Sequence, residues 1–435
     1  MATVGQGPTS QLRVGLWDAL TLLGRNGDFA RLYTAELISF AGDWFATVAI
    51  LGLVNQITGS AALTTLVLVA QMIATAAFSP IGGYLADRLD RRRLMIGADI
   101  VRVLLALGYL LIDGRGDVWL AFVLTAGISA LSAVFTPASN ASVPNLVDPE
   151  DLPAANVLVG AAWGTMLAVG AALGGVVAAA FGRDAAFVGD AVSFVLSAVL
   201  LVGIRRRFAE APVRAEHPRM VEAIRETVRY ARRDRRVLAL LTVKGGFGLG
   251  AGVIGLLPIL ALEVFDAGDR GTGILWGFRG IGALVGPFLV SRFTRDLRSL
   301  LAAVGVAFVV YGVFYGAVPL MTSLWSAGVL VMLAHLGGGA QWTLSTYGLQ
   351  RIVPDHIRGR VFSFDFGLVT LTLALSILIG GWAADHFDPR AVMAIMAAVA
   401  LAYAVVWSVA TTPLRRSAAE FDSGPVRDSG TAGRV

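Results

Sequence analysis

Among the ionisable residues inside long apolar stretches of this sequence, five are candidates for a functional site: Asp43, Arg102, Lys244, Arg279 and His335. A charged side chain at membrane depth costs free energy, so such residues commonly belong to ion, proton or ligand pathways. Asp43 is the strongest candidate because it lies near the middle of its stretch, where a carboxyl could bind and release a proton. We expect it to exchange protons or contact a bound molecule; the alternative is a structural ion pair with an intramembrane arginine.

The other four residues have alternative interpretations. Arg102 follows Asp99 by three residues, so the two can pair along one helix face or Arg102 can contact a ligand. Arg279 has no acid within four residues and needs a partner from another helix or an anionic ligand. Lys244 lies at the start of its stretch and could extend its ammonium to the membrane surface. His335 could relay protons or make a hydrogen-bonded helix contact.

The apolar stretches are long enough to be membrane-spanning helices. The chain of 435 residues is 56% hydrophobic and 15% charged, whereas soluble domains carry about 25% charged residues. A spanning helix needs about 20 mainly apolar residues. The sequence therefore predicts an all-α membrane protein with twelve spans, over residues 31–54, 62–85, 94–113, 117–139, 155–181, 185–204, 237–262, 272–292, 299–318, 323–345, 361–384 and 390–411.

Missing residue types limit the possible chemistry. The chain has no cysteine, which excludes disulfides, thiolate nucleophiles and zinc–thiolate sites. Its four histidines are not at helical ligand spacing, so we expect neither a metal nor another cofactor. We find no phosphate-binding loop of the Walker type and no nucleophile–base arrangement. We therefore expect a protein that is not an enzyme.

The basic residues predict the orientation in the membrane. The net charge is +5, which alone could indicate nucleic-acid binding. With the N-terminus inside, however, 28 of the 35 Lys and Arg residues fall in inner segments, four in outer loops and three within spans. An excess of Lys and Arg marks the cytoplasmic side. We expect a multi-pass protein of the cell membrane with both termini in the cytoplasm and no nucleic-acid partner.

The two halves of the chain resemble each other. The segment "GGYLADRLDR" from Gly82 aligns with "GPFLVSRFTR" from Gly286 at an offset of 204, and "GGVVAAAFGRDA" from Gly174 aligns with "GGWAADHFDPRA" from Gly380 at an offset of 206. Two offsets that agree within two residues indicate two homologous six-helix halves. Both halves have the same orientation, which is a parallel repeat of the kind found in transporters.

These patterns divide the chain into five parts. The linker contains "MVEAIRETVRYARRDRR", which predicts a basic amphipathic helix against anionic lipids. The parts are a cytoplasmic segment with an interfacial helix (1–30), a first bundle (31–204), the basic cytoplasmic linker (205–236), a second bundle (237–412) and a disordered cytoplasmic tail (413–435).

Small and aromatic residues suggest how the spans pack. Gly82 and Gly83 would let the second span approach a neighbour closely, and "GAALGG" from Gly170 suggests a second small-residue helix contact. Eight aromatic residues could line an apolar cavity: Trp44, Phe45, Phe135, Trp163, Trp276, Trp342, Tyr347 and Phe366.

The loop after the second span carries a family signature. "GYLADRLDRR", which contains Gly83, Asp87, Arg88 and Arg92, resembles the loop motif of the major facilitator superfamily, although Asp90 stands where many members have glycine. Three further segments resemble the branch of macrolide efflux proteins and enterobactin exporters: "LISFAGDWF", "ADIVRVLLA" and "VPDHIRGRVFSF". The resemblance covers residues 28–412.

The resemblance implies a cytoplasmic latch, in which the Asp87 carboxylate joins the two halves by binding backbone N–H groups of the eleventh span around Gly359–Phe362. Such a latch favours the outward-facing state. The arginines of the loop could instead serve only topology. We assign the gating role to Gly83, Asp87, Arg88, Arg92, Gly359, Arg360 and Asp365. The second half has Ser291 at the position equivalent to Asp87, so only one latch is expected.

The resemblance also implies a function. It is that of a secondary transporter, working by alternating access and exporting small amphiphilic or cationic compounds such as drugs in exchange for protons. An alternative is export of siderophores or other organic anions, with Arg102 and Arg279 as counter-charges. A transport-inactive membrane receptor is a third interpretation. We expect a monomer whose partners are the small-molecule substrate, protons and lipids.

Overall fold

The computed structural model describes residues 16–206, 220–290 and 296–416. Within these ranges the chain is helical and contains no strand, as the sequence predicts. Eleven of the described helices are long and apolar enough to cross a membrane. The twelfth predicted span, 323–345, lies in α13 (Leu324–Ile352), which has 29 residues but whose apolar run is interrupted by His335 and Gln341.

The first group of helices follows the predicted spans closely. Contacts join α2 to α6 and α7, α3 to α5, and α4 to α5 and α7. Side chains cap the helix starts: Asp90 accepts a hydrogen bond from Arg93 N at 2.8 Å, which explains an acid where family members have glycine. The group consists of α1 (Leu16–Arg25), α2 (Gly27–Thr58), α3 (Ala61–Arg88), α4 (Arg91–Gly108), α5 (Val118–Leu146), α6 (Leu152–Phe181) and α7 (Arg183–Val202).

The first span of the second group, which the sequence predicts as one continuous helix over 237–262, breaks at Ala251. The Ser376 hydroxyl accepts a hydrogen bond from Gly252 N at 2.8 Å and donates one to Leu249 O at 2.6 Å, so it satisfies backbone groups that the break frees. The group consists of α8 (Met220–Arg233), α9 (Arg235–Gly250), α10 (Gly252–Ile259), η3 (Leu260–Val264), α11 (Gly268–Val290), α12 (Leu297–Ala317), α13, α14 (Asp355–Ala384), α15 (Pro389–Ala410) and α16 (Thr412–Arg416).

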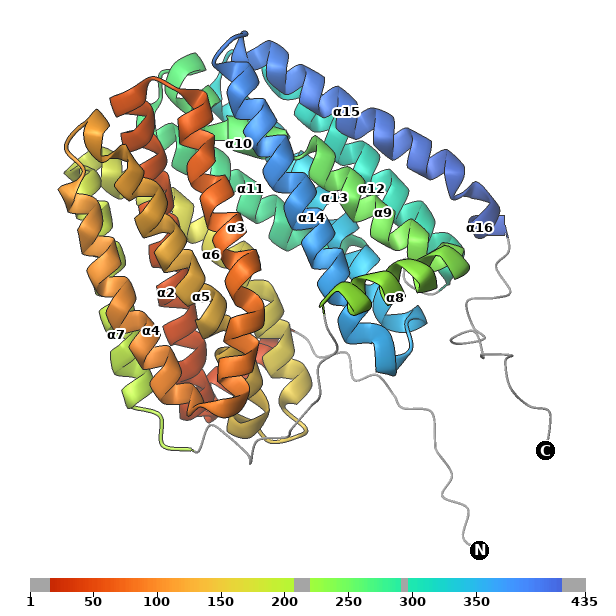
Figure 1. Ribbon diagram of the computed structural model, residues 1–435, viewed down its shortest axis with the longest axis horizontal. Coiled ribbons are helices and arrows are strands. Elements are labelled where there is room, and N and C mark those ends of the chain that lie inside the picture. The colour runs from red at the N-terminus through yellow and green to blue at the C-terminus, as the bar shows by residue number, and fades with distance from the viewer. Residues whose placement is uncertain (1–15, 207–219, 291–295, 417–435) are drawn as a thin grey trace, which may run out of the picture.

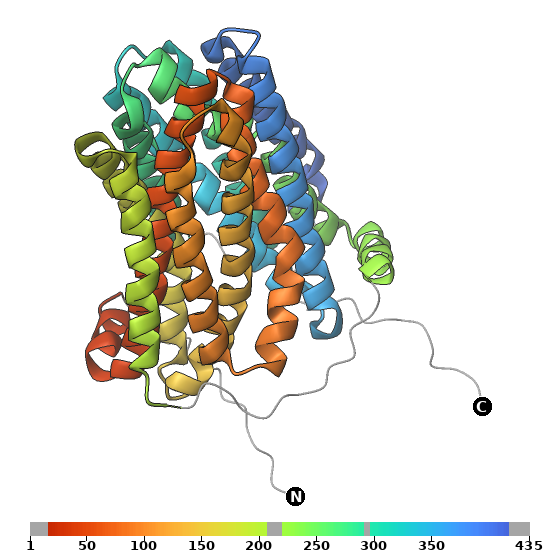
Figure 2. The ribbon, with the colours of Figure 1, turned by 60° about the vertical axis from the view of Figure 1, so that its left-hand side comes forward.

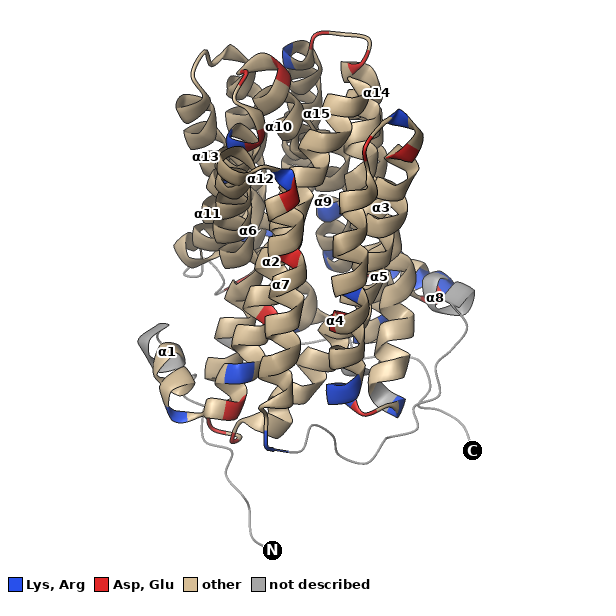
Figure 3. Cartoon of the chain, turned by 90° about the vertical axis from the view of Figure 1, so that its left-hand side faces the viewer, with Lys and Arg blue, Asp and Glu red and all other residues tan. Residues whose placement is uncertain are grey.

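The two groups lie side by side and meet along α3–α14 and α6–α11 (Figure 1). We call the end that carries α1, α8 and the loop 89–90 the basic end, and the opposite one the closed end. Toward the basic end α3 and α14 diverge (Figure 1), and Phe78, Ile81 and Tyr84 on this part of α3 are exposed. Figure 2 shows α8, in light green, beside the bundle rather than within it. The middle parts of the helices carry few charges (Figure 3).

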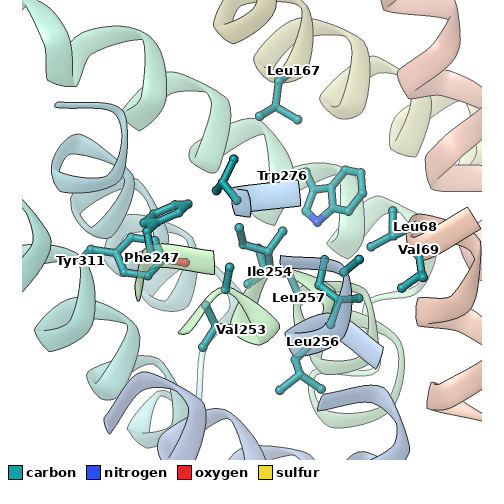
Figure 4. Close-up of a cluster of buried hydrophobic side chains, with 14 of the residues drawn as sticks. Leu68, Val69, Leu167, Phe247, Val253, Ile254, Leu256, Leu257, Trp276 and Tyr311 are labelled. Atoms are coloured by element: carbon teal, nitrogen blue, oxygen red, sulfur yellow. The ribbon is translucent and has the colours of Figure 1, made fainter. Parts of the chain in front are cut away.

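Buried apolar side chains from both groups form one cluster. Figure 4 shows Leu68 and Val69 of α3 near Trp276 of α11 and Leu257 of α10. The rings of Trp44 and Trp276 meet edge to face, with centroids 5.1 Å apart. This apolar contact joins the groups on the closed-end side of the functional site.

Close helix packing depends on glycine at particular positions. A Cβ atom at Gly82 would lie 2.2 Å from the carbonyl oxygen of Ala133, so α3 approaches the backbone of α5 there. At Gly174 it would lie 2.7 Å from Phe45 Cα, and at Gly175 it would meet Gly273 of α11. At Gly83 it would meet no atom within 4 Å. The predicted small-residue contacts therefore hold for Gly82 and for the Gly170–Gly175 segment.

Gly82 and Gly83 form a matched pair for a stability test. Gly82→Ala would force α3 away from α5 and should lower the free energy of unfolding by about 1–3 kcal/mol. Gly83→Ala adds its methyl group in open space and should leave stability equal or raise it by about 0.5 kcal/mol. Thermal unfolding of the purified protein in detergent measures both. Equal melting temperatures of the two variants would contradict the packing.

Candidate functional site

A central cavity of about 460 Å³ lies between the two helix groups. Both groups contribute to its wall. Four of the eight predicted aromatic residues line it, together with Phe40, which is outside the predicted set. The lining includes Asp43, Trp44, Gln71, Ser132, Trp163, Trp342, Phe366 and Thr370. The other four predicted aromatics, Phe45, Phe135, Trp276 and Tyr347, are not part of the lining. Phe135 and Trp276 are buried behind it, beside Arg102 and Trp44 respectively. A second cavity, of about 490 Å³ between α11, α12 and α13, is lined by aliphatic residues with few polar groups, so the central cavity is the candidate site.

Asp43 lies on the cavity wall and pairs with Arg102. Arg102 Nη2 is 2.9 Å from Asp43 Oδ1 and 2.8 Å from Oδ2, and it also donates to Ser132 Oγ at 2.8 Å. The Arg102 side chain is fully buried, whereas the Asp43 side chain is 17% exposed. Asp43 therefore pairs with an intramembrane arginine, as one of the two interpretations expects, and its side chain also faces the cavity. Exchange of a proton or contact with a bound molecule stays a prediction.

Arg102 also holds a second acid. Its Nη1 donates to Asp99 Oδ1 at 3.1 Å, as the three-residue spacing predicts, and to Ser39 Oγ at 2.8 Å. The guanidinium carbon lies 4.0 Å from the ring centroid of Phe194 on α7. Helices α2, α4, α5 and α7 thus meet at one guanidinium.

A third acid, Asp190 of α7, belongs to the same cluster. Asp190 lies near the outer end of its predicted span, 185–204, which suggests a place close to the membrane surface, but its side chain is fully buried. Gly42 of α2 leaves room for this carboxyl, because a Cβ atom added at position 42 would lie 2.6 Å from Asp190 Oδ1. The carboxyl therefore packs against the backbone of α2, one residue before Asp43.

Arg279 and His335 lie together in the second group. Arg279 Nε donates to His335 Nε2 at 3.1 Å, which leaves the ring proton on Nδ1, 3.1 Å from Tyr315 Oη. The Arg279 guanidinium carbon is 5.6 Å from the ring centroid of Trp163, a residue of the cavity wall. No described acid pairs with Arg279, so its charge rests against aromatic rings and a neutral histidine.

The sequence suggested that the Lys244 ammonium could extend to the membrane surface, but in the structure it does not. Only 2% of the residue is exposed, because its ammonium pairs with Asp365 of α14. It also donates to Thr346 Oγ1 at 2.9 Å and lies 5.0 Å from the ring centroid of Trp342. The Lys244–Asp365 pair lies within the second group, so it does not join the two groups.

The signature loop lies at the basic end. Asp87 is in the last turn of α3, but its side chain lies outside the described residues. Arg88 lies over the Tyr84 ring at 4.2 Å, and Arg92 donates to the carbonyl of Val202 on α7. Both arginines thus make contacts within the first group.

The helix that was expected to receive the Asp87 carboxylate around Gly359–Phe362 begins earlier than the sequence predicts. Helix α14 begins at Asp355, so Gly359–Phe362 lie in its second turn and not at its N-terminus. Ile357 N donates to the Pro354 carbonyl at 3.2 Å, so the free N–H groups at the start of this helix belong to residues 355 and 356. Arg360 pairs with Glu226 and thereby attaches α8 to α14. Gly359 is exposed.

At the closed end, a carboxylate from one group caps a helix of the other. Asp385, at the C-terminus of α14, accepts hydrogen bonds from Ser60 Oγ at 2.7 Å and from the backbone N–H groups of Ala61 and Ala62 at the start of α3. A negative charge is stabilised at a helix N-terminus. Asp385 therefore joins the groups at the end opposite to Asp87.

An ion pair makes a second connection at the closed end. Arg183 Nε donates to Asp269 Oδ2 at 2.7 Å, and its guanidinium also bonds to Gln56. A Cβ atom at Gly52 would lie 1.8 Å from Asp269 Oδ1, so this acid fits against α2 because position 52 has no side chain. We call the Asp385–α3 and Arg183–Asp269 contacts the closed-end clamp.

A model of the family described as transmembrane secretion effectors matches residues 22–426. The chain belongs to this family of the major facilitator superfamily. This confirms the resemblance that the signature loop carries. Family and fold are those of membrane transporters and not of enzymes.

Three bacterial relatives are similar over most of their lengths. An MFS-type transporter of Bacillus subtilis is 26% identical over 377 residues, which are 81% of this chain and 86% of the relative. Macrolide efflux protein A of Streptococcus pyogenes is 22% identical over 370 residues, 82% and 89% of the two chains. The staphyloferrin A transporter of Staphylococcus aureus is 22% identical over 362 residues, 79% and 88% of the two chains.

A solved structure shows the same fold. It is that of a bacterial homologue of the human lysosomal transporter Spinster, in an inward-facing and unoccupied conformation. The TM-score is 0.70 at 16% identity, and the match covers 91% of this chain and 98% of that one. The predicted major facilitator fold is therefore confirmed.

Three functional candidates are absent from the sequence interpretation: Asp190 as part of the Arg102 cluster, Asp385, and the Arg183–Asp269 pair. The sequence did contain a signal for Asp190. Asp190, Ser193 and Ser197 place polar side chains along one face of an otherwise apolar helix. The clamp residues stand next to loops, where acids and arginines are common, so their pattern gave no signal.

The Arg102 cluster can be tested by removing its cation. Arg102→Met leaves Asp43 and Asp99 without their counter-charge and should lower the free energy of unfolding by about 3–5 kcal/mol. Combining it with Asp43→Asn and Asp99→Asn should restore part of that loss. Thermal unfolding in detergent measures the effect, with exposed Arg93→Met as the control. A melting temperature of Arg102→Met equal to that of Arg93→Met would contradict the cluster.

The closed-end clamp can be tested with a single thiol, since the chain has no cysteine. Thr65 is buried against Gly381 at the closed end, so a Thr65→Cys thiol should react slowly with a maleimide. Adding Asp385→Ala should speed labelling by about tenfold, which corresponds to about 1.4 kcal/mol of lost closure. Asp113→Ala, an exposed acid of the same end, serves as the control and should change nothing. Equal rates in both double variants would show that Asp385 does not hold this end closed.

Proposed function

We propose that this transporter exports small amphiphilic cations in exchange for protons. The observation that carries the proposal is the position of Asp43, whose carboxylate faces the central cavity while it pairs with a fully buried arginine. A carboxylate with one side on a cavity and the other on Arg102 can hold either a substrate cation or a proton. Aromatic side chains of the wall, Trp44, Trp163 and Trp342, supply apolar and cation–π surfaces for such a substrate.

The excess of arginine between the spans supports a cytoplasmic position for the basic end. With that orientation, the described conformation is inward-open, because the groups meet at the closed end and diverge at the basic end (Figure 1). The substrate would then enter from the cytoplasm and leave after the closed-end clamp has opened. We also propose the division into bundles 31–204 and 237–412, with the terminal segments and linker in the cytoplasm.

The closed-end clamp and the signature loop suggest how the two states alternate. In the inward-open state Asp385, at the end of α14, caps the N-terminus of α3. In the outward-open state Asp87, at the end of α3, would cap the N-terminus of α14 at residues 355 and 356. The same two helices would thus exchange one carboxylate cap for another at opposite ends. Gly83, Arg88, Arg92, Gly359 and Arg360 remain predicted gating residues around this second contact.

Helix α8 is proposed to lie on the cytoplasmic surface of the membrane. It carries Arg225, Arg229, Arg232 and Arg233, and Glu226 holds it to Arg360 of α14. Basic residues on an amphipathic helix attract anionic lipids. Because α14 is one of the helices that move between states, α8 would connect the lipid surface with the gate.

Export of an organic anion is the second candidate function. Arg279 supports it, since the described residues offer this buried cation no acid and its guanidinium lies behind Trp163 of the cavity wall. The staphyloferrin A transporter is a relative of this chain. Competition between labelled ethidium and panels of organic cations or anions would distinguish the two functions.

The proposed function predicts the behaviour of Asp43→Asn. In proteoliposomes with an imposed pH gradient, the wild type should transport ethidium or a macrolide, and the rate should depend on the gradient. Asp43→Asn should reduce gradient-driven transport by at least about tenfold, because the neutral amide can exchange neither a proton nor a cation. Asp113→Asn, an exposed acid, is the matched control. Transport by Asp43→Asn with unchanged pH dependence would contradict the proposal.

A further inference from the structure

Asp190 has a buried carboxyl group that takes no part in the exchange proposed at Asp43. It lies on α7, is fully buried, and packs against α2 beside Gly42. Both of its carboxyl oxygens lack a hydrogen-bond partner among the described residues. An unpaired polar group in such a position is rare in folded proteins and calls for a chemical explanation.

The neighbours of Asp190 do not neutralise it. The charged or titratable groups that face it are Asp43 of α2, Arg102 of α4 and Tyr109 of the short η1 helix (Tyr109–Leu111). Tyr109 Oη shares its hydrogen bond with a threonine hydroxyl of α5, and Ser193 Oγ donates to the main-chain carbonyl of Asp190 at 2.7 Å. Both hydroxyls thus make their hydrogen bonds to other atoms, although Ser193 Oγ lies close to the Asp190 carboxyl beside Gly42.

The terminal nitrogens of Arg102 are also committed elsewhere, whereas its Nε has no partner among the described residues. Its two terminal nitrogens donate to Asp43, Asp99, Ser39 and Ser132. One guanidinium thus faces three buried carboxyls, and two of them already hold its hydrogen bonds. A second uncompensated negative charge in this interior would cost several kcal/mol, whereas a protonated carboxyl costs far less.

We propose that Asp190 holds a proton in the described conformation and is the site from which the transported proton is released. The ligand of this site is the proton itself. The inference rests on the proposed exchange function and deepens it by separating two tasks: Asp43 receives the substrate cation, and Asp190 stores the proton.

The exchange follows from the shared arginine. When a substrate cation binds Asp43, that carboxylate no longer requires Arg102, and the guanidinium can turn an N–H group toward Asp190. The O–H bond of Asp190 then breaks, its electron pair stays on the carboxylate, and the proton passes along Asp43 to the cavity water. One positive charge enters the cluster and one leaves, so its net charge is unchanged.

Infrared spectroscopy tests the stored proton without any substrate. A protonated carboxyl in an apolar site has a C=O stretch that an ionised carboxylate lacks. At neutral pH the purified wild type should show this band, Asp190→Asn should lose it, and Asp184→Asn, which changes an exposed acid of the same helix, should keep it. A band that survives in Asp190→Asn, or that disappears only in Asp43→Asn, would overturn the assignment.

Transport measurements separate this inference from the proposed function. In proteoliposomes, Asp190→Asn should lose ethidium transport driven by a pH gradient by about tenfold or more, yet retain exchange of ethidium at equal concentrations, which moves no net proton. If Asp190→Asn keeps the gradient-driven rate while Asp43→Asn loses it, Asp190 is not the proton site and the proposed function stands. A wild type that ignores the gradient contradicts the proposed function itself. Loss of both activities by a folded Asp190→Asn protein would assign Asp190 a structural role and overturn the inference.

Discussion

One guanidinium, that of Arg102, balances the buried acids at the centre of the first helix group. It contacts Asp43 and Asp99 directly, and Asp190 lies in the same cluster without a partner among the described residues. In an interior of low polarity, three carboxyls and one cation cannot all carry their charges. We infer that the cluster holds a proton or binds a cation; it reaches the central cavity through Asp43. In the proposed exchange, proton and substrate therefore compete for this cluster.

The packing of the helices keeps this competition connected to the gates. Helix α2 carries Asp43 in its middle and Gly52 near its closed end, where Asp269 of the other group fits against it. Helix α7 carries Asp190, and Arg183, the clamp partner of Asp269, begins the same helix. A change of charge at the centre thus acts on the same two helices that hold the closed end together. These two helices connect the cluster with the clamp, and we propose that they carry the coupling between them.

Composition and periodicity predicted the fold because the membrane leaves few alternatives: apolar stretches must be helices that satisfy their own backbone groups. They also identified Asp43, Arg102 and the Arg102–Asp99 spacing. The break at Ala251 was not predictable, because its freed backbone groups are satisfied by Ser376, more than 100 residues away. The burial of Asp190 was missed for a similar reason. The sequence gives only the distance of a residue from the end of its span, whereas the burial of its side chain depends on the helix that packs against it. Lys244 was misjudged because its acid partner lies on another helix.

Proton release on substrate binding tests the central claim most directly. Purified protein in weakly buffered detergent solution, with a pH indicator dye, is mixed with ethidium or a macrolide that carries a positive charge, and bound compound is measured in the same sample. The account predicts that one proton appears in solution for each cation bound, because the Arg102 cluster cannot hold both. Binding of the cation without any release of protons would contradict it.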